Sequence, residues 1–577
     1  MSIDVTVTIG GAAGQGIQTV GDLLALVCHR AGLHLMVIND FESRIRGGHS
    51  FMQLRISDEP VYAADDAIHL LVALNRETLA IHAEEIRAGG YALIDEQSGE
   101  EDDTDAGGKA GIAVVGFRRL AEEAGGGIMA NTVAAGAALS MLGAPDELVE
   151  SVIKDQFRDK SQTVRDNNLE AAKMGRDAVA EIPFDWRLQW PGQSPRGKLV
   201  SGAQALALGA LAADCRVACF YPMSPATGVM LGMAGYMDRF PLVVEQAEDE
   251  IAAINMVIGA SFAGVRAMTA TSGGGFSLMV EGIGMAGITE TPAVIINAQR
   301  PGPATGLPTR TAQGDLQFVI HASQDEFPRF VLAPQTLDEG YEIMIRAFHL
   351  AEAYQVPVIV LVDQYFADSL GIAGGKWNVP ETVERFLVSD ADMEDPAHYR
   401  RFALTDSGIS PRAVPCAGKA RVMVTANEHT QDGHLSEVIS DRNGQVEKRA
   451  KKMKHMAAEI KAPEILHPDS SLLLVAWGST CGVVREAVMR LRKENHEVGA
   501  VFFTDIWPFP AADAAKALSV PRRFVMVEQN GSAQLGSLIR AHTGLKAAGA
   551  IVRYDGRPMK PGDVVQEAMQ YLEESND

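Results

Sequence analysis

The stretch Cys215–Gly228, with the sequence CRVACFYPMSPATG, decides the fold that this chain predicts. It joins an apparent β-strand, Cys215–Phe220, to a loop that two prolines hold stiffly, because each proline fixes its own φ and restricts the residue before it. A stiff loop at the carboxyl end of a strand can hold the hydroxyl of Ser224 against a ligand. The same hydroxyl could instead serve only as a local partner for the backbone.

Strand-like and helix-like segments alternate along the whole chain. This alternation predicts an α/β protein of several domains with doubly wound parallel sheets. Ligands bind beyond the carboxyl ends of the strands in such sheets, so chemistry is expected at the turns that follow strands. The expected strands are Asp4–Ile9, Phe51–Ile56, Leu70–Leu74, Ala293–Asn297, Val358–Val362, Leu472–Trp477, Gly499–Phe503 and Phe524–Glu528, and the expected helices are Gln18–Ala31, Glu248–Ala263, Leu278–Thr289, Glu339–Tyr354, Val483–Lys493 and Ala533–Thr543.

Composition divides the 577-residue chain into three globular segments. The first covers residues 1–184 and ends at a linker, residues 185–198, that contains two prolines and little periodicity. The second covers residues 199–375. Residues 376–466 are expected to form an irregular connecting region, and residues 467–577 form the third segment.

Charge and cysteine content exclude several classes of protein. The net charge of −23 argues against nucleic acid as a partner, because phosphate binding requires a basic face. The N-terminus lacks the features of a signal peptide, and no apolar run reaches about 18 residues, so no membrane span is expected. The five scattered cysteines predict a reducing, cytoplasmic location. Cys215 and Cys219 have no further ligands close by, so core thiols are favoured over an iron–sulfur cluster.

Two motifs in the first segment border expected strands, one after Asp4–Ile9 and one before Phe51–Ile56. Gly11, Gly14 and Gly16 precede a helix, and a glycine-rich turn before a helix N-terminus can hold a phosphate group. Their spacing is not that of a dinucleotide-binding turn, and a tight strand–helix turn is the alternative. Arg46 belongs to the cluster Phe41–Ser50, whose arginines suit phosphates or carboxylates, or which forms a surface loop with structural salt bridges.

Three further motifs follow expected strands in the second segment. Glu250 belongs to an acidic run that opens an apolar helix, where the helix dipole already favours carboxylates, although one of them could turn inward. Gly274 is the middle one of three glycines, which indicate either close backbone approach or a mobile turn. Arg300 and Arg310 lie in a proline-rich loop, where an arginine can hold a substrate carboxylate or a structural ion pair.

In this order, these motifs resemble those of 2-oxoacid:ferredoxin oxidoreductases. Tyr221–Pro225 is similar to the Y-P-I-T-P loop of the family's α subunit, with Met223 and Ser224 in place of isoleucine and threonine. The turn Gly11–Gly16 and the sequence Arg46-Gly47-Gly48 resemble its γ subunit. The order of γ and then α on one chain is similar to that of the fused γα subunit.

The resemblance is strongest to the 2-oxoglutarate type, which Ala426–His429 and Asp432–His434 also fit. It implies a γ domain in residues 1–184 and a pyrimidine-binding domain for thiamine diphosphate in residues 199–375. It further implies a domain like the C-terminal domain of transketolase in residues 467–577.

The resemblance also implies roles for individual residues. Glu250 aligns with the glutamate that contacts the aminopyrimidine ring, where a carboxylate can shift the ring to the imino form that removes the thiazolium C2 proton. Arg300 aligns with the arginine that engages the substrate carboxylate, and Ser224 with a neighbouring hydroxyl donor. The further candidates are Arg310, Thr305 and Asn297 for the substrate, Pro222, Met223 and Gly274 for thiamine diphosphate, and Gly11, Gly14, Gly16 and Arg46 for CoA or a subunit interface.

The implied reaction converts 2-oxoglutarate, CoA and oxidised ferredoxin into succinyl-CoA, carbon dioxide and reduced ferredoxin, and its reversal would fix carbon dioxide. A separate β subunit is expected to supply the diphosphate-binding half, Mg²⁺ and an iron–sulfur cluster of the 4Fe-4S type, so no metal is expected in this chain. A dimer of αβ heterodimers is expected. Ser224 in place of threonine leaves the 2-oxoacid open, with pyruvate and branched-chain acids as alternatives.

Other functions remain open from the residues alone. One is a non-redox carboligase similar to transketolase, although this chain lacks a diphosphate motif of its own. Another is a non-catalytic subunit for assembly and cofactor burial. The basic stretch Glu447–His455 could dock an acidic ferredoxin, but a solvated helix face is favoured.

Overall fold

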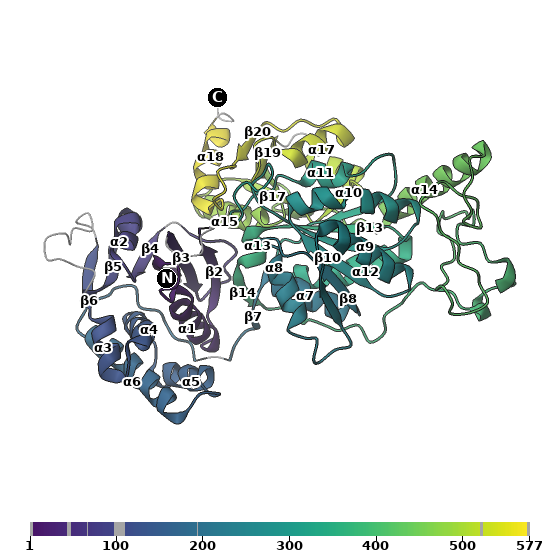
Figure 1. The fold of residues 1–577 in the computed structure, drawn as a ribbon. Coiled ribbons are helices and arrows are strands. Elements are labelled where there is room, and N and C mark those ends of the chain that lie inside the picture. The colour runs from purple at the N-terminus through teal and green to yellow at the C-terminus, as the bar shows by residue number, and fades with distance from the viewer. Residues whose placement is uncertain are drawn as a thin grey trace. The chain divides into compact units, whose positions relative to one another are not determined.

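The computed structural model describes residues 4–42, 48–65, 67–96, 110–192, 194–519 and 523–573. The chain divides into two compact units, and each is described by itself. Unit 1 comprises Met1–Val200, Ser369–Gly375 and Lys560–Gly562, and unit 2 comprises Ser201–Asp368, Lys376–Met559 and Asp563–Asp577. In Figure 1, unit 1 is drawn mainly in purple and blue, and unit 2 runs from teal to yellow.

Unit 1 is built on one eight-stranded sheet of order β6-β5-β4-β1-β3-β2-β14-β7. Strands β1, β4, β5 and β6 are parallel, but β3 is antiparallel to both β1 and β2. The expected α/β fold with mainly parallel sheets is confirmed, and β3 departs from it because the short connection from β2 to β3 cannot hold the crossover that parallel strands require. The strands are β1 (Asp4–Ala12), β2 (His34–Asp40), β3 (His49–Ser57), β4 (Ile68–Ala73), β5 (Ile86–Asp95), β6 (Gly111–Val115), β7 (Lys198–Ser201) and β14 (Leu370–Ala373).

Helices of unit 1 pack through small residues. A Cβ on Gly136 of α4 would lie 2.2 Å from the carbonyl oxygen of Ala172 in α6, and Gly175 is equally close to Val133, so the two helices touch backbone to backbone. Apolar side chains of α1 and α4 share the core with β1. The helices are α1 (Ile17–Arg30), α2 (Arg76–His82), α3 (Phe117–Ala124), α4 (Ala130–Met141), α5 (Asp146–Gln156) and α6 (Gln162–Ala178).

Unit 2 contains a seven-stranded sheet of order β18-β12-β13-β11-β10-β8-β9, which is parallel except for β18. Ile295 of β11 packs with α9 and α10, and its neighbour Ile296 packs with α7 and α12, so helices cover both faces. The elements are α7 (Gly202–Ala212), β8 (Val217–Phe220), α8 (Thr227–Ala234), β9 (Val243–Gln246), α9 (Glu250–Phe262), β10 (Ala267–Thr271), α10 (Gly273–Ile288), β11 (Ala293–Gln299), α11 (Leu316–His321), β12 (Phe330–Leu332), α12 (Leu337–Tyr354), β13 (Pro357–Asp363), α13 (Gln364–Asp368) and β18 (Asp505–Trp507).

A five-stranded sheet of order β15-β17-β16-β19-β20, called the C-terminal sheet below, completes unit 2. Val475 and Phe503 of this sheet lie in the same apolar cluster as Ile295, so the two sheets of unit 2 share a core. The elements are β15 (Glu464–Leu466), β16 (Leu472–Trp477), α15 (Thr480–Lys493), β17 (Val498–Phe503), α16 (Ala511–Leu518), β19 (Arg523–Glu528), α17 (Gln534–Thr543), β20 (Gly549–Val552) and α18 (Pro561–Glu573).

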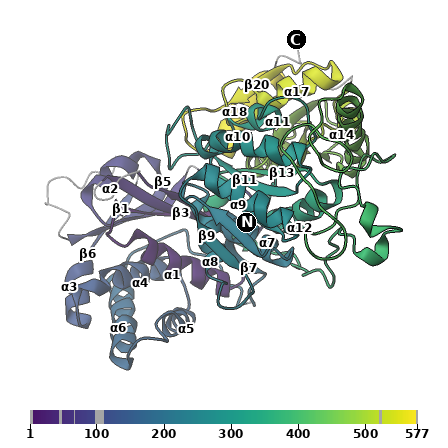
Figure 2. The ribbon, with the colours of Figure 1, turned by 45° about the vertical axis from the view of Figure 1, so that its right-hand side comes forward.

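The connecting region contains the longest helix of the described residues, α14 (Ile439–Glu459), drawn in green in Figure 1 and Figure 2. The basic stretch in this helix is not a solvated face, and that prediction is wrong for three of its cations. Lys448 and Lys452 are buried and both pair with Glu290, which is 1% exposed, and buried Arg449 pairs with Glu428. These three side chains are therefore not exposed for docking ferredoxin.

Across the described ranges, every helix is too short or too polar to cross a lipid bilayer.

Candidate functional site

Four of the predicted motifs meet at one edge of the seven-stranded sheet. Strands β9, β8, β10 and β11 are neighbours in that order and run parallel, so their carboxyl ends share an edge. Glu250 follows β9, the loop with Ser224 follows β8, Gly274 follows β10 and Arg300 follows β11. The ligand-binding edge of a doubly wound sheet is where such residues are expected to act together.

Glu250 is buried at the start of α9 without serving as its cap. The cap is Asp249, whose carboxylate accepts a hydrogen bond from the Ala252 N–H at 2.7 Å. Glu250 is 3% exposed, and its Oε1 has no hydrogen-bond partner among the described residues. An unsatisfied buried acceptor costs about 1–3 kcal/mol, so this oxygen is suited to a donor from a ligand.

The glycine run lies in the first turn of α10. A Cβ on Gly275 would lie 2.6 Å from Glu250 Oε1 and 2.1 Å from Thr271 Oγ1, so any side chain at this position would displace the carboxylate. Of the two interpretations of the run, the structure therefore supports close backbone approach at Gly275. It places the glycines inside the helix and not in a turn.

Arg300 connects two of the loops. Its Nη1 donates to the backbone carbonyl of Ser224 at 2.7 Å, while its buried Nε has no partner among the described residues. Partial burial lowers the pKa of the Arg300 guanidinium from its ordinary value. A Cβ on Gly274 would lie 4.0 Å from Met223 Sδ and 3.6 Å from the Ala304 carbonyl oxygen, so both loops also meet α10.

Asp315 is a polar residue of this edge that the sequence did not indicate, because no motif surrounds it. Asn297 Nδ2 donates to Asp315 Oδ2 at 3.2 Å, and the Asp315 N–H donates to Gln299 Oε1 at 2.9 Å. Burial raises the pKa of the Asp315 carboxyl. A Cβ on Gly273 would lie 2.4 Å from Asp315 Oδ2, so this carboxylate stands at the N-terminus of α10.

The other residues predicted for the substrate or thiamine diphosphate lie in the same loops. Pro222 and Arg310 are half-buried, and Thr305 is exposed. The Arg310 N–H donates to the Leu307 carbonyl at 3.1 Å. These three residues lie in the same two loops as Ser224 and Arg300.

The glycines predicted for CoA lie in unit 1. Gly11 is part of β1, which extends to Ala12, so it does not belong to the turn. Gly14 and Gly16 have φ values of +90° and +85°, a backbone conformation that glycine adopts readily. A Cβ on Gly16 would lie 1.8 Å from Asn131 Nδ2, which explains this glycine by close packing. Arg46 lies outside the described residues.

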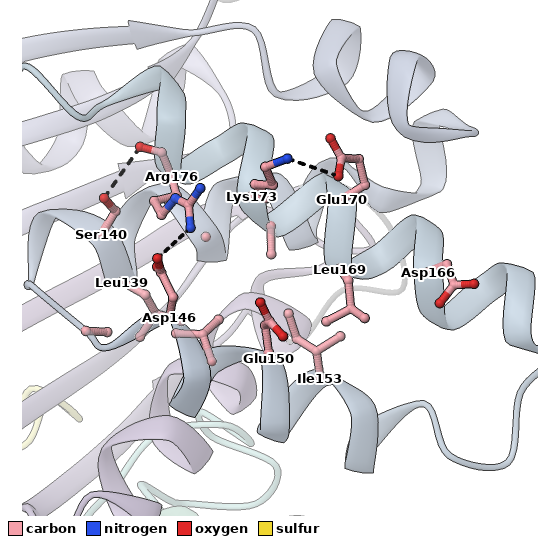
Figure 3. Close-up of a pocket in the computed structure, with 14 residues that line it drawn as sticks. Leu139, Ser140, Asp146, Glu150, Ile153, Asp166, Leu169, Glu170, Lys173 and Arg176 are labelled. Carbon is pink, nitrogen blue, oxygen red and sulfur yellow. Dashed lines mark hydrogen bonds and ion pairs between the residues drawn. The ribbon is translucent and has the colours of Figure 1, made fainter. Parts of the chain in front are cut away.

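A cavity of about 320 Å³ lies between α4, α5 and α6 of unit 1 (Figure 3). Its floor is apolar and includes Leu139 and Ile153. At the rim, Arg176 pairs with Asp146 at 2.6 Å. None of the predicted site residues lines this cavity, so it is separate from the edge described above.

The two neighbouring cysteines are core thiols. Cys215 and Cys219 are buried, and burial raises their pKa to about 12 and about 11. Cluster ligation requires thiolates, which this environment disfavours.

Family comparisons cover most of the chain. Residues 208–448 match the family described as pyruvate flavodoxin/ferredoxin oxidoreductase, thiamine diphosphate-binding. Residues 6–178 match the family described as pyruvate ferredoxin/flavodoxin oxidoreductase. Residues 470–564 match core domain II of pyruvate:ferredoxin oxidoreductase.

Individual proteins are similar over almost the whole chain. Subunit alpha of 2-oxoacid:ferredoxin oxidoreductase 2 from Aeropyrum pernix is 30% identical over 99% of this chain and 98% of its own length. The 2-oxoglutarate synthase subunit KorA of Methanocaldococcus jannaschii is 33% identical over 58% of this chain and 88% of its own. The structure of 2-oxoglutarate:ferredoxin oxidoreductase from Magnetococcus marinus with 2-oxoglutarate, coenzyme A and succinyl-CoA bound is 31% identical, covers 99% of this chain and 100% of that chain, and has a TM-score of 0.92.

Proposed function

The chain belongs to the 2-oxoacid:ferredoxin oxidoreductases as an alpha-type subunit with fused gamma and alpha segments, and from this premise we propose that its substrate is 2-oxoglutarate. In the proposed reaction, 2-oxoglutarate, CoA and two oxidised ferredoxins give succinyl-CoA, carbon dioxide and two reduced ferredoxins. The reverse direction would fix carbon dioxide. Similarity to the 2-oxoglutarate synthase subunit and to the structure with bound 2-oxoglutarate supports this substrate.

The observation that carries the proposed type of reaction is that the carboxylate oxygen Oε1 of Glu250 has no partner among the described residues and lies beside Gly275, which has no side chain. These residues fit a flat, nitrogen-rich ring that donates a hydrogen bond, as the aminopyrimidine of thiamine diphosphate does. When bound, thiamine diphosphate supplies the carbon nucleophile and electron sink that decarboxylation of a 2-oxoacid needs. Glu250 would hold a proton at the ring, and Met223, Pro222 and Gly274 would line the ring's surroundings.

Arg300 and Ser224 would bind the 2-oxoacid. The guanidinium can donate to a ligand, because Nη1 donates to the Ser224 carbonyl while the buried Nε has no partner among the described residues. A guanidinium fork suits a carboxylate, and a second carboxylate distinguishes 2-oxoglutarate from pyruvate. Arg310 and Thr305 are candidates for contacts farther along the substrate.

A β subunit is the proposed partner, because the relatives are named as subunit alpha. Elements around Glu250 expose large apolar side chains, including Ile251 at 48%, Leu278 at 49% and Leu231 at 63%. Exposed apolar surface of this kind marks protein–protein contacts. We expect the β subunit to cover these side chains and to bring the diphosphate-binding half, Mg²⁺ and an iron–sulfur cluster, with ferredoxin as electron acceptor and two αβ pairs per complex.

Reconstitution tests the proposal. The purified chain is combined with a β subunit from the same organism, and reduction of a viologen dye is followed with 2-oxoglutarate and CoA. The expected result is dye reduction that requires both substrates and both subunits. Full activity of this chain alone would contradict the proposal.

A second substrate deserves a direct comparison, because the matching families are described for pyruvate. The same assay with pyruvate gives a second value of kcat/KM. Under the proposal, this value is lower than that for 2-oxoglutarate. A higher value would move the assignment to pyruvate and leave the reaction type unchanged.

A further inference from the structure

The C-terminal sheet has no part in the proposed function, yet it holds the segment that carries Arg300. We call residues 300–314 the Arg300 loop. The residues from Gly302 to Leu307 of this loop are all exposed. Within its tip, the Leu307 N–H donates to the Pro301 carbonyl at 3.0 Å. An exposed loop with few internal bonds needs support from outside if its arginine is to stay in one place.

The loop is closed at its base. Gln299 precedes it and Asp315 follows it, and the Asp315 N–H donates to Gln299 Oε1 at 2.9 Å. Asn297, two residues before Gln299, donates to the Asp315 carboxylate. These bonds fix the two ends of the loop against β11 and do not involve the residues between them.

Gln313 binds the returning arm of the loop to the C-terminal sheet. The side chain is fully buried at 0% exposure. Its Nε2 donates to the Trp477 carbonyl at 2.8 Å, and its Oε1 accepts from the Gln529 N–H at 3.0 Å. Its backbone N–H donates to the Gln529 carbonyl at 2.7 Å, and its carbonyl accepts from Asn530 Nδ2 at 3.1 Å. The backbone N–H and carbonyl of Gln313 and both polar atoms of its side chain therefore form hydrogen bonds with residues at the ends of β16 and β19.

Two neighbouring contacts extend this attachment. Gln534 Nε2 donates to the Gly314 carbonyl at 2.7 Å, and the Thr311 N–H donates to the Gly556 carbonyl at 3.2 Å. Gly556 has a φ of +82°, and a Cβ there would lie 3.0 Å from the Cβ of Arg310. Segments that follow strands of the C-terminal sheet thus contact the loop at Arg310, Thr311, Gln313 and Gly314.

We propose that Gln313 is a positioning residue that fixes the Arg300 loop on the C-terminal sheet and thereby holds Arg300 and Arg310 ready for the substrate carboxylates. The inference rests on the proposed function, because it assigns substrate binding to those arginines. A loop that is held in its binding conformation loses less entropy when the substrate binds. Loosening it is therefore expected to weaken binding of the 2-oxoacid and to leave the chemistry at Glu250 intact.

The test compares variants of the full chain in complex with its β subunit. Methionine at position 313 keeps the volume and removes both side-chain hydrogen bonds. Gln313→Met is expected to raise KM for 2-oxoglutarate about tenfold, with kcat changed less than about twofold and KM for CoA unchanged. Amide hydrogen exchange of residues 300–314 should accelerate.

A matched control separates positioning from general loss of stability. Gln445 is also buried and donates to a backbone carbonyl, that of Phe402 at 3.0 Å, but it lies in α14. Gln445→Met is expected to lower stability without changing KM. If Gln313→Met does not fold, Gln534→Ala, at a half-buried position, carries the same expectation.

Combination with Arg300→Ala distinguishes the inference from the proposed function. If Gln313 acts through Arg300 and Arg310, adding Gln313→Met to the variant with both Arg300→Ala and Arg310→Ala raises KM no further. Unchanged KM in Gln313→Met beside a raised KM in Arg300→Ala would overturn the inference and leave the function standing. Unchanged KM in Arg300→Ala would overturn the substrate role of Arg300, and unchanged hydrogen exchange in Gln313→Met would overturn the attachment itself.

Discussion

At the start of α9, one of two adjacent carboxylates caps the helix, and the other binds a ligand under the proposed function. Asp249 satisfies the helix N-terminus by accepting from Ala252, and this frees Glu250 to turn inward. A buried carboxylate oxygen without a partner is unfavourable for folding alone. The position of the Glu250 oxygen is explained if a bound ligand donates a hydrogen bond to it.

Replacement of Glu250 tests this division of roles. Glu250→Gln keeps the size of the side chain and removes the charge, so turnover of the complex is expected to fall by about 10²–10⁴-fold while assembly with the β subunit is unchanged. Steady-state kinetics and size-exclusion chromatography provide the two measurements. Glu248→Gln, an exposed neighbour, is the control and should retain activity. Near-normal turnover in Glu250→Gln would remove the assigned role.

Single residues of the edge differ in how far the sequence could predict them. Glu250, Ser224 and Arg300 stand in motifs after strands, so their types and positions were visible. Asp315 and Gln313 were not, because their partners are set by the fold. The carbonyl that Gln313 Nε2 contacts belongs to Trp477, 164 residues away, and no local pattern encodes that pairing.

Among the elements, α14 is attached to the rest of unit 2 by buried ion pairs. Lys448 and Lys452 share the carboxylate of Glu290, and burial among cations lowers the pKa of Lys448 to about 7. Buried ion pairs gain little in stability when intact, but removal of one partner leaves an uncompensated charge.

Substitution of Glu290 should therefore loosen α14. Glu290→Gln is expected to cost about 3–5 kcal/mol, because both lysines lose the anionic partner that they share. Thermal unfolding and limited proteolysis of residues 376–466 measure the effect. Glu447→Gln, on the exposed side of α14, should behave as the wild type. Equal melting temperatures for the two variants would show that this cluster does not hold the helix.

Asp363 gives the junction of the two sheets of unit 2 a pH dependence. This carboxylate ends β13, accepts from the Ser479 hydroxyl, and has a pKa raised from 3.8 to about 6 because of burial. The folded state therefore binds more protons than the unfolded state between these values, so its contribution to stability is present below pH 4 and is lost as the pH rises through 6.

Asp363→Asn should remove this dependence. Relative to the variant, the wild type is expected to lose about 2 kcal/mol between pH 4 and pH 6. Melting temperatures of both proteins across this range measure the difference. Parallel profiles would show that the Asp363 carboxyl does not titrate in this window.

The regular elements of unit 2 were largely predictable from sequence, and the edges of the sheets were not. Buried apolar runs such as Val358–Val362 and Leu472–Trp477 are strands in the structure, with bounds that agree within one residue. Short strands such as β14 and β18 form by pairing with strands that are distant in the sequence, so no local pattern predicts them. The charge of α14 concealed the burial of one of its faces, because buried lysines with a carboxylate partner look like solvated ones in sequence.

At the scale of the whole molecule, exposed apolar side chains around Glu250 call for a partner. Ile251 lies in the first turn of α9 and Leu278 in the second turn of α10, the two helices whose N-termini border the candidate site. A partner that covers them would also close the site from water, which strengthens the electrostatic effect of Glu250.

A charge placed among these side chains should block assembly. Ile251→Lys and Leu278→Lys are each expected to weaken binding of the β subunit at least about tenfold, because the ammonium would be buried without a partner. Analytical ultracentrifugation measures the affinity. Ile439→Lys, at an exposed apolar position in α14, is the control and should assemble normally. Normal assembly of both test variants would place the partner elsewhere.

The most direct test is an experimental structure of this chain with its β subunit and thiamine diphosphate. The account predicts that Glu250 Oε1 lies within hydrogen-bonding distance, about 2.5–3.2 Å, of a nitrogen of the aminopyrimidine ring. It also predicts that the ring lies over the α10 N-terminus at Gly274 and Gly275. A ring bound elsewhere, with the Glu250 carboxylate satisfied by protein groups alone, would contradict the account.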